Sequence, residues 1–438
     1  MRTTENPADL SCSYSMKLPL TIGTAPDGSL VQLPLSALRR HMLALGASGS
    51  GKTVLCKVIV EECIRKGLPV VAIDPQGDLA SLAIDEDPAT LVRMGVDPGI
   101  AREFRAKVDV KIWTPGASLG IPLSFTPAMN VPTGIRPEDR IRAFGSVATS
   151  LAAMVGAADE STSVAFSMVL EYADSHGLAC ENIDDFINFL GDPPLPLART
   201  LEAVYDSKAR AKSHKSFLLK TLGANRLLFD LGAPIDVNEL FGLYRGGPTD
   251  NGKARLSVIY LNTLTSQEDK EIFIALLCSA MYQWMLTLDG SQIWGMLYMD
   301  EVAPYLPPVR NPASKQGLMM LLRQARKYGL CCLLATQSPG DIDYKALGQV
   351  GTMALGRIFG ERALGKVEPV IRAQPGVDTE AIMRGLPSMR KGQFILVNPD
   401  HFEVPAEAQV RWLVSKHHTV TADGVADLVS DADREKYG

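Results

Sequence analysis

The segment Gly46–Thr53 constrains this chain more than any other feature of its sequence. It reads GASGSGKT and satisfies the pattern GxxxxGK[ST]. A compact apolar run, Met42–Leu45, precedes it, and Val54–Ile64 has the mixed apolar and charged spacing of a helix. A second strand is predicted at Leu68–Ile73. Strand, loop, helix and strand in this order form a βαβ unit, which predicts a parallel sheet and an α/β fold.

The residues of this loop suit phosphate binding. Glycines let backbone N–H groups turn inward around a β-phosphate, and the helix N-terminus adds the positive end of its dipole. Lys52 would reach the β- and γ-oxygens, and the Thr53 hydroxyl would bind Mg²⁺. The predicted nucleotide-binding residues are Gly46, Ser48, Gly49, Ser50, Gly51, Lys52, Thr53 and Val54.

A second motif separates a hydrolase from a switch or a kinase. The apolar strand Met296–Met299 ends in two carboxylates, Asp300 and Glu301. Asp300 would hold Mg²⁺ through water, and Glu301 is placed to orient and deprotonate the attacking water. Paired with the phosphate loop, this strand end predicts the Walker B motif of an ATPase, with ATP and Mg²⁺ as cofactors.

Gln337 ends another predicted buried strand, which includes Leu330–Ala335. A strand between the two phosphate-facing ones would place the Gln337 amide near the γ-phosphate, where it could sense the nucleotide state. The alternative is a polar strand end that caps the turn at 338–341.

Upstream of that strand, a predicted helix carries a basic face. Its apolar stripe consists of Leu318, Leu321, Leu322 and Ala325. Arg323, Arg326 and Lys327 gather on a face well away from this stripe. The cluster is either a solvated surface or the source of a guanidinium for a neighbouring subunit's γ-phosphate.

Composition limits the class of protein. The chain has 438 residues, of which 46% are hydrophobic and 21% charged, as in soluble globular proteins. Its seven cysteines form no CxxC pair, which favours a reducing compartment. Because the N-terminus lacks an export signal and no apolar run is typical of a membrane span, we expect a cytoplasmic protein. The net charge of −5 means that nucleic acid would need a local basic surface.

The pattern along the chain predicts five segments. We expect a short β segment at 1–40 that includes a hairpin, the first part of a P-loop ATPase core at 41–115, a mostly helical insertion at 116–250, the second part of the core at 251–415, and a polar, loosely held tail at 416–438. The most basic window, 199–226, is either a solvated helix face or a surface that contacts DNA.

Four stretches together resemble the HerA–FtsK superfamily of ring-forming, ATP-driven translocases, and within it the HerA-type prokaryotic ATPases. They are GASGSGKT at 46–53, VVAIDPQGDL at 70–79, LYMDEVAPYLP at 297–307 and RQARKYGLCCLLATQSPGDID at 323–343. The resemblance covers residues from about 17 to 90 and from 253 to 418. It implies a RecA-like fold of the type whose catalytic Glu accompanies an additional strand, and a homo-hexameric ring with ATP at the subunit interfaces and DNA in the channel.

The resemblance also assigns roles. Lys52 and Thr53 would bind phosphates and Mg²⁺, Asp300 would support the metal, Glu301 would be the catalytic base and Gln337 the sensor. Arg326 matches the arginine that relatives insert into the adjacent subunit's site, and Arg357 is the competing candidate. Asp74 and Asp78 match acidic positions with a structural or metal-supporting role.

The resemblance therefore implies a motor that translocates double-stranded DNA. HerA relatives usually carry a β-barrel before the phosphate loop, whereas only 45 residues precede Gly46 here. This departure argues against coupling to a nuclease through such a barrel, so a nuclease or effector partner would bind elsewhere. Two alternatives are an ATPase that acts on protein cargo, as in secretion or pilus assembly, and an ATP-gated scaffold subunit of a defence complex. Candidate DNA contacts are Arg310, Lys315, Arg390, Lys391 and the window 199–226.

Overall fold

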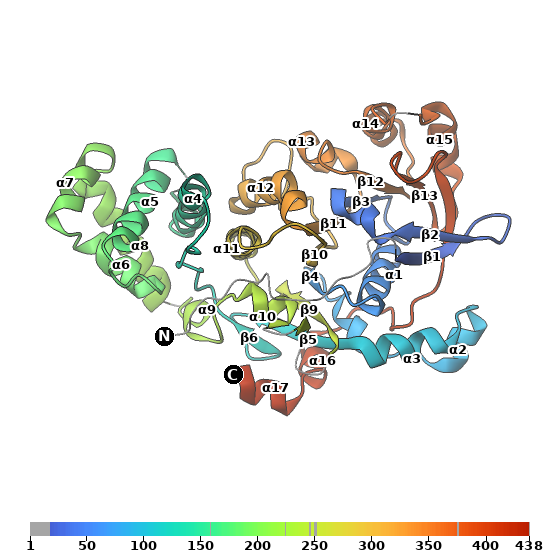
Figure 1. Cartoon of the computed structure of the whole chain (residues 1–438), viewed down its shortest axis with the longest axis horizontal. Coiled ribbons are helices and arrows are strands. Elements are labelled where there is room, and N and C mark those ends of the chain that lie inside the picture. The colour runs from blue at the N-terminus through green and yellow to red at the C-terminus, as the bar shows by residue number, and fades with distance from the viewer. Residues whose placement is uncertain are drawn as a thin grey trace.

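A twelve-stranded sheet forms the centre of the molecule (Figure 1). The computed structural model describes residues 18–157, 159–223, 225–244, 247–248, 252–374 and 376–437. In spatial order the strands are β2 (Leu30–Pro34), β1 (Pro19–Thr24), β14 (Ala406–Val410), β13 (Gln393–Val397), β12 (Thr352–Leu355), β3 (Met42–Leu45), β11 (Leu330–Thr336), β10 (Gly295–Met299), β4 (Val70–Asp74), β9 (Ala254–Tyr260), β5 (Val108–Pro115) and β6 (Ile121–Leu123). A separate pair consists of β7 (Leu243–Tyr244) and β8 (Gly247–Pro248).

The sheet has a parallel and an antiparallel part. From β12 to β6 every neighbouring pair is parallel, which confirms the predicted α/β fold with a parallel central sheet. Beyond β12, the strands β13, β14, β1 and β2 add to the sheet in antiparallel pairs. The predicted N-terminal hairpin is therefore present as β1–β2, and it joins the central sheet through β14.

Helices cover both faces of the parallel part. The helices of the core are α1 (Lys52–Arg65), α2 (Pro88–Arg93), α3 (Pro98–Lys107), α11 (Gln267–Met285), α12 (Ala313–Tyr328), α13 (Tyr344–Leu347), α14 (Glu361–Arg372) and α15 (Thr379–Gly385). The crossovers β3–α1–β4 and β10–α12–β11 run in opposite directions along the sheet, and right-handed crossovers then place α1 and α12 on opposite faces. Both faces are thus shielded from water, as fully apolar strands such as β3 and β11 require.

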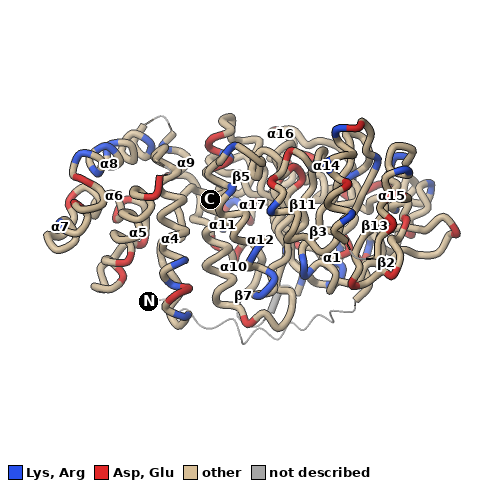
Figure 2. The backbone as a smooth tube through the Cα atoms, turned by 90° about the horizontal axis from the view of Figure 1, so that it is seen from above, with Lys and Arg blue, Asp and Glu red and all other residues tan. Residues whose placement is uncertain are grey.

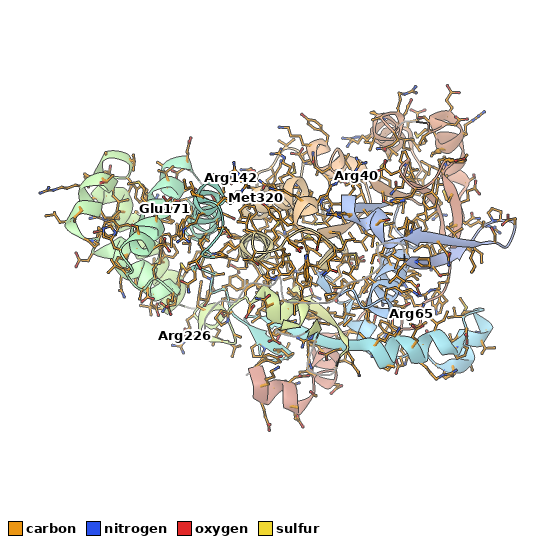
Figure 3. The ribbon with its side chains drawn as sticks, viewed as in Figure 1. Arg40, Arg65, Arg142, Glu171, Arg226 and Met320 are labelled. Carbon is orange, nitrogen blue, oxygen red and sulfur yellow. The ribbon has the colours of Figure 1, made fainter. Side chains whose placement is uncertain are left out.

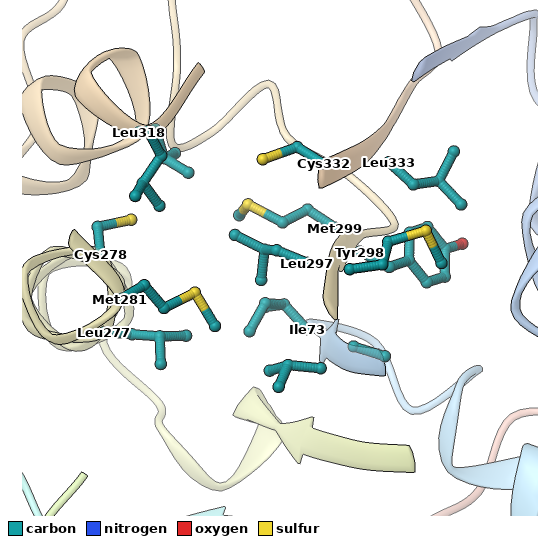
Figure 4. Close-up of a cluster of buried hydrophobic side chains, with 14 of the residues drawn as sticks. Ile73, Leu277, Cys278, Met281, Leu297, Tyr298, Met299, Leu318, Cys332 and Leu333 are labelled. Carbon is teal, nitrogen blue, oxygen red and sulfur yellow. The ribbon is translucent and has the colours of Figure 1, made fainter. Parts of the chain in front are cut away.

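Figure 4 shows that β10 contributes side chains to the cores on both faces of the sheet. Leu297 and Met299 point toward α11 and α12, where they face Met281 and Leu318, whereas Tyr298 points to the opposite side. All of these side chains are buried. This is the alternation that a strand imposes on successive side chains. Because Tyr298 faces away from α11, it lies on the side of the sheet that α1 covers.

Ion pairs join α1 to its neighbour α3 at the end of α1. Arg65, labelled in Figure 3, contacts Glu103 of α3, and its guanidinium lies 2.5 Å from the Glu62 carboxylate. Helix α1 is buried along most of its length, and Lys57, Glu61 and Glu62 are at most 1% exposed. The helix that begins in the phosphate loop therefore lies inside the molecule, with Glu61 and Glu62 in ion pairs and Lys57 hydrogen-bonded to neutral oxygens.

The insertion is mostly helical, as expected. It contains α4 (Pro137–Met154), α5 (Glu160–Ser175), α6 (Ile183–Gly191), α7 (Leu195–Val204), α8 (Ser207–Leu222), α9 (Leu227–Asp230) and α10 (Val237–Phe241). Helices α4–α8 form a group at one end of the molecule (Figure 1), and α4 packs against α11 of the core. Phe166, Phe186 and Phe217 contact one another inside this group. Strand β6, which the sequence assigned to the insertion, pairs with β5 in the central sheet instead.

The C-terminal segment corrects one expectation. Residues 416–438 do not form a loosely held tail, because α16 (Ala422–Asp427) and α17 (Asp431–Tyr437) dock on the far end of the sheet. The Tyr437 ring lies 5.2 Å from that of Trp113, and Lys111 pairs with Asp433 at 2.6 Å. Val425 and Tyr437 are among the few apolar residues of this charged segment, and their packing holds the two helices against the sheet.

Part of the predicted N-terminal segment lies outside the described residues, namely its first 17 residues, which include Cys12. The described cysteines are all free and buried. Among the described helices, none combines the length and the apolar character needed to cross a bilayer.

Candidate active site

The phosphate loop connects β3 to α1 at the carboxyl edge of the sheet. Gly49 and Gly51 have φ of 74° and 100°, which other residues rarely adopt. A Cβ on Gly46 would lie 2.6 Å from the Ser50 hydroxyl oxygen, so this position also requires glycine. Ser50 Oγ is buried and has no hydrogen-bond partner among the described atoms. A buried, unpartnered hydroxyl inside a loop of this shape fits the phosphate of a nucleotide.

Lys52 points back into the loop. Its Nζ donates hydrogen bonds to the carbonyl oxygens of Gly46, at 2.7 Å, and Ala47, at 3.3 Å. Burial lowers the pKa of Lys52, and the nearby carboxylates of Glu301 and Asp300 oppose that shift. The ammonium is thus held at the position where phosphate oxygens would accept its hydrogen bonds. Val54 is buried in the next turn, whereas Ser48 lies exposed at the tip of the loop.

The Walker B strand brings its acidic end to the same edge. Thr53 Oγ1 lies 3.4 Å from Asp300 Oδ2, and the Tyr298 hydroxyl donates to Asp300 Oδ1. Burial raises the pKa of Asp300, and the Tyr298 hydrogen bond acts against this. Among the described residues no cluster of three or more His, Cys, Asp or Glu could hold a metal. A hydroxyl and one carboxylate suit Mg²⁺, which keeps several waters and binds substrate phosphates.

Glu301 is fixed beside Lys52. The N–H of Val302, the next residue, donates to the Ala335 carbonyl at 3.0 Å, which ties the end of β10 to β11. Ala303 N–H lies 3.4 Å from Glu301 Oε1. Burial raises the pKa of Glu301, and its hydrogen bonds to Thr336 and Ala303 act against this. A carboxylate with a raised pKa is a better general base for water.

Gln337 comes directly after β11, which lies between β3 and β10 as the sequence predicted. Thr336 pairs with Leu45, the last residue before the phosphate loop. Gln337 is exposed at this edge. A short turn follows at Pro339–Asp341, so the alternative role of a strand end beside a turn is also compatible with the geometry. The position of the strand is confirmed, and the sensor role stays a prediction.

The two candidate arginines lie at different edges of the sheet. Arg326 is exposed in the last turn of α12, before β11 begins, and therefore lies at the amino edge. Arg357 follows β12 at the carboxyl edge, where its carbonyl accepts the Ala47 N–H of the phosphate loop at 2.8 Å. Its Nε is buried without a hydrogen-bond partner in the described structure. Arg357 thus borders the phosphate loop of its own chain, and Arg326 does not.

The acidic positions after β4 shape the neighbouring loop. Asp74 accepts the N–H groups of Gly77, Leu79 and Ala80 at 2.7–2.9 Å. Burial raises the pKa of Asp74 to about 6. Asp78 accepts the hydroxyl of Thr419 at 2.5 Å. These contacts favour the structural alternative for both residues.

Sequence reasoning missed two residues next to the site. Tyr298 orients Asp300, and Lys57 is completely buried one turn after Thr53. Lys57 Nζ donates to Ser81 Oγ at 2.7 Å and to the Lys416 carbonyl at 2.8 Å. An apolar strand with one tyrosine and a helix with one lysine carry no pattern that would single out either residue.

Comparison with known families agrees with this geometry. Residues 20–135 match the family model described as "Helicase HerA, central domain". This segment of the chain is therefore similar to the central domain of HerA. The match supports the resemblance to HerA-type ATPases over these residues, and the geometry of the phosphate loop and of Asp300 fits ATP and Mg²⁺. A comparison with curated proteins finds no match.

Solved structures share the fold over nearly the whole of this chain. VirB4 of Thermoanaerobacter pseudethanolicus is 13% identical, with a TM-score of 0.58 over 90% of this chain and 96% of that one. The plasmid coupling protein TrwB, solved in complex with ADP and Mg²⁺, is 14% identical, with a TM-score of 0.57 over 93% of both chains. TrwB with the GTP analogue GDPNP gives 0.56 at 14% identity, covering 95% of this chain and 94% of that one. At such identities the likeness shows the fold alone.

Proposed function

We propose that this ATPase is a homo-hexameric motor that translocates double-stranded DNA. The placement of Arg326 carries the proposal. Strand β11 has seven residues and separates Arg326 from Gln337 along the sheet, a distance of about 20 Å at the rise of a strand. Arg326 therefore reaches no phosphate bound by its own chain. It can complete an ATP site only in a second copy, which is the arrangement of a ring.

Within one site the residues divide the work. Lys52 and Ser50 would bind the phosphates, and Thr53 and Asp300 would hold Mg²⁺, which neutralises phosphate charge when it is bound. Glu301 orients the attacking water and takes its proton at a carboxylate oxygen. Arg326 acts in the adjacent subunit, with Arg357 as the competing candidate for that role, and Gln337 senses the nucleotide.

The surface charges support DNA as cargo. They also shorten the set of residues that could contact DNA phosphates. Arg310 pairs with Glu271 at 2.7 Å, and Lys315 pairs with Asp343 at 3.0 Å, so both are occupied within the chain. Helix α8, in contrast, carries the exposed residues Lys208, Lys212 and Lys215 at a spacing that puts them on one face, and Figure 2 shows basic positions along this helix. In the described part of the chain these three lysines form no ion pair. They and the exposed Arg390 and Lys391 are our candidates for phosphate contacts.

The test is steady-state ATP hydrolysis titrated with long linear double-stranded DNA at low and moderate salt. We expect several-fold stimulation that fades with salt, and no turnover in Lys52→Ala. Lys212→Gln with Lys215→Gln should weaken the stimulation, whereas the matched exposed pair Arg93→Gln with Arg102→Gln should not.

Two outcomes would contradict the proposal. Robust turnover that is indifferent to DNA would favour the protein-cargo alternative. Turnover too slow to move a polymer, together with ATP-dependent assembly, would favour an ATP-gated scaffold with a nuclease or effector partner. The cytoplasmic location stays a prediction in either case.

A further inference from the structure

A large cleft lies between the helical insertion and the core, and none of the nucleotide-site residues lines it. Its volume is about 1080 Å³. Its walls are the segment 126–135, the end of α5 with the loop that follows, the start of α10 and the last turns of α11. Its lining includes the carboxylates of Asp174, Glu181 and Asp236 but no Lys, Arg or His. The cleft is therefore apolar and acidic.

One wall of the cleft is an extended segment with free backbone groups. Residues 127–132 belong to no helix, strand or turn, and no backbone–backbone hydrogen bond joins them to other described residues. Side chains hold the segment in place instead: Gln283 Nε2 donates to the Ala128 carbonyl at 2.8 Å, and Arg140 donates to the Pro132 carbonyl at 3.2 Å. Met129 and Val131 are buried. A fixed, extended backbone without a neighbouring strand is a surface to which another extended chain can add.

The Gln283 side chain independently indicates that a hydrogen-bond donor is missing from the cleft. Its side chain lines the cleft and is only 3% exposed. Its Nε2 is used by Ala128, but its Oε1 is buried with no partner among the described atoms. Buried amide oxygens in folded proteins are nearly always hydrogen-bonded. An N–H group entering the cleft would satisfy this one.

We propose that the cleft binds an extended segment of a partner protein that carries alternating apolar and basic side chains. Its backbone would pair with the free groups of residues 127–132, and one N–H would reach Gln283 Oε1. Its apolar side chains would contact Leu170, Leu178 and Trp284. Its basic side chains would meet the carboxylates, which would repel the phosphates of a nucleic acid.

Glu181 is the carboxylate best suited to a test. Asp174 pairs with Arg140, and Asp236 caps α10, so changing either would disturb the fold. Glu181 is exposed in the loop after α5. Glu202 on α7 is equally exposed in the same insertion but does not line the cleft. Glu202→Lys is therefore the matched control for Glu181→Lys.

The experiment measures fluorescence anisotropy of a labelled decapeptide that alternates leucine and lysine, titrated with the full chain without nucleotide. We expect saturable binding that Glu181→Lys weakens by about tenfold or more and that Glu202→Lys leaves within about twofold. A peptide with glutamate in place of lysine should bind at least about tenfold more weakly. Basal ATP turnover should be the same in all variants, which shows that they are folded.

Several results would overturn the proposal. They are absence of saturable binding, equal binding of the lysine and glutamate peptides, and an unchanged affinity in Glu181→Lys. Loss of self-association in Glu181→Lys would assign the cleft to a second copy of this chain, and competition of the peptide by DNA would assign it to nucleic acid. None of these readouts depends on ATP hydrolysis, so this proposal and the DNA-motor proposal fail separately.

Discussion

The two edges of the central sheet differ in how far their polar groups are satisfied. At the carboxyl edge, Ser50 Oγ has no described partner, Lys52 is turned onto loop carbonyls, and Gln337 is exposed. At the amino edge, both ring nitrogens of the buried His41 are hydrogen-bonded, to α12 and to β11, while the side chain of Arg326 is exposed. The carboxyl edge therefore has free groups that can bind an anion. The amino edge has its buried groups satisfied and an exposed guanidinium, that of Arg326. Such complementary edges suit two copies of one chain.

Burial keeps the His41 ring at the amino edge neutral. It precedes β3 and, among the described non-glycine residues, it alone has a positive φ, of 61°. Its Nδ1 accepts the Cys332 N–H at 3.0 Å, so its Nε2 donates to the Leu322 carbonyl at 3.0 Å. The neutral ring thus joins the phosphate-loop strand to β11 and to α12, one turn before Arg326.

The largest expected effect separates the two edges directly. Arg326→Ala should lower the rate of ATP hydrolysis by about 10³–10⁵-fold, the range for arginines that act on a neighbouring site. Mixed with Glu301→Gln subunits, it should recover some activity. At some mixed interfaces, an intact Arg326 from one subunit then meets an intact Glu301 from the other.

Arg323→Ala is the matched control, because Arg323 is exposed on the same helix one turn earlier. Its rate should stay close to that of the unchanged protein. A mild defect in Arg326→Ala, or no recovery on mixing, would move the role to Arg357 and remove the contrast between the edges.

The second effect is confined to the carboxyl edge. Glu301→Gln removes the proton acceptor and keeps the shape of the side chain, so turnover should fall by about 10²–10⁴-fold with ATP affinity retained. Because burial raises the pKa of Glu301, activity in the unchanged protein should fall with decreasing pH through a value above the ordinary pKa of 4.5. Rates and ATP binding measured across pH would check this. Retained turnover would exclude Glu301 as the base.

The third prediction concerns only the amino edge. Burial lowers the pKa of His41 from 6.5 to about 4. Its contribution to stability is therefore complete above pH 6.5 and is lost as the pH falls through about 4, because the unfolded chain takes up the proton first. The loss should be about 3 kcal/mol. Urea unfolding from pH 7 to pH 4 should show a flatter profile in His41→Asn, and equal profiles would contradict the buried neutral ring.

The smallest effect is a change in metal requirement. Tyr298→Phe removes the hydroxyl that orients Asp300 and leaves the packing of the ring intact. We expect the Mg²⁺ concentration needed for half-maximal turnover to rise by about threefold to tenfold, which corresponds to the loss of one hydrogen bond. Titration of activity with Mg²⁺ checks this, and Tyr305→Phe, also on a buried ring, is the control. An unchanged requirement would make Tyr298 a packing residue only.

Local patterns predicted the elements that meet at the carboxyl edge. The phosphate loop, the acidic end of β10 and the position of β11 between β3 and β10 follow from glycine spacing, apolar strands and parallel topology. What could not be predicted depends on distant partners. Lys57 and Glu61 are charged residues buried inside a helix because the segment 411–416 supplies their partners. Likewise, Arg310 looked available for DNA until the fold placed Glu271 beside it.

The order of the strands has a consequence for synthesis on the ribosome. Strand β3, which leads into the phosphate loop, is complete at Leu45, yet its neighbours β11 and β12 end at Thr336 and Leu355. Pairings between such distant parts of a chain form slowly, and the exposed edges aggregate easily in the meantime. A nascent chain therefore has no ATP site until most of it has been translated. The nucleotide can act as a ligand that stabilises the finished subunit, but not as a template for its first half.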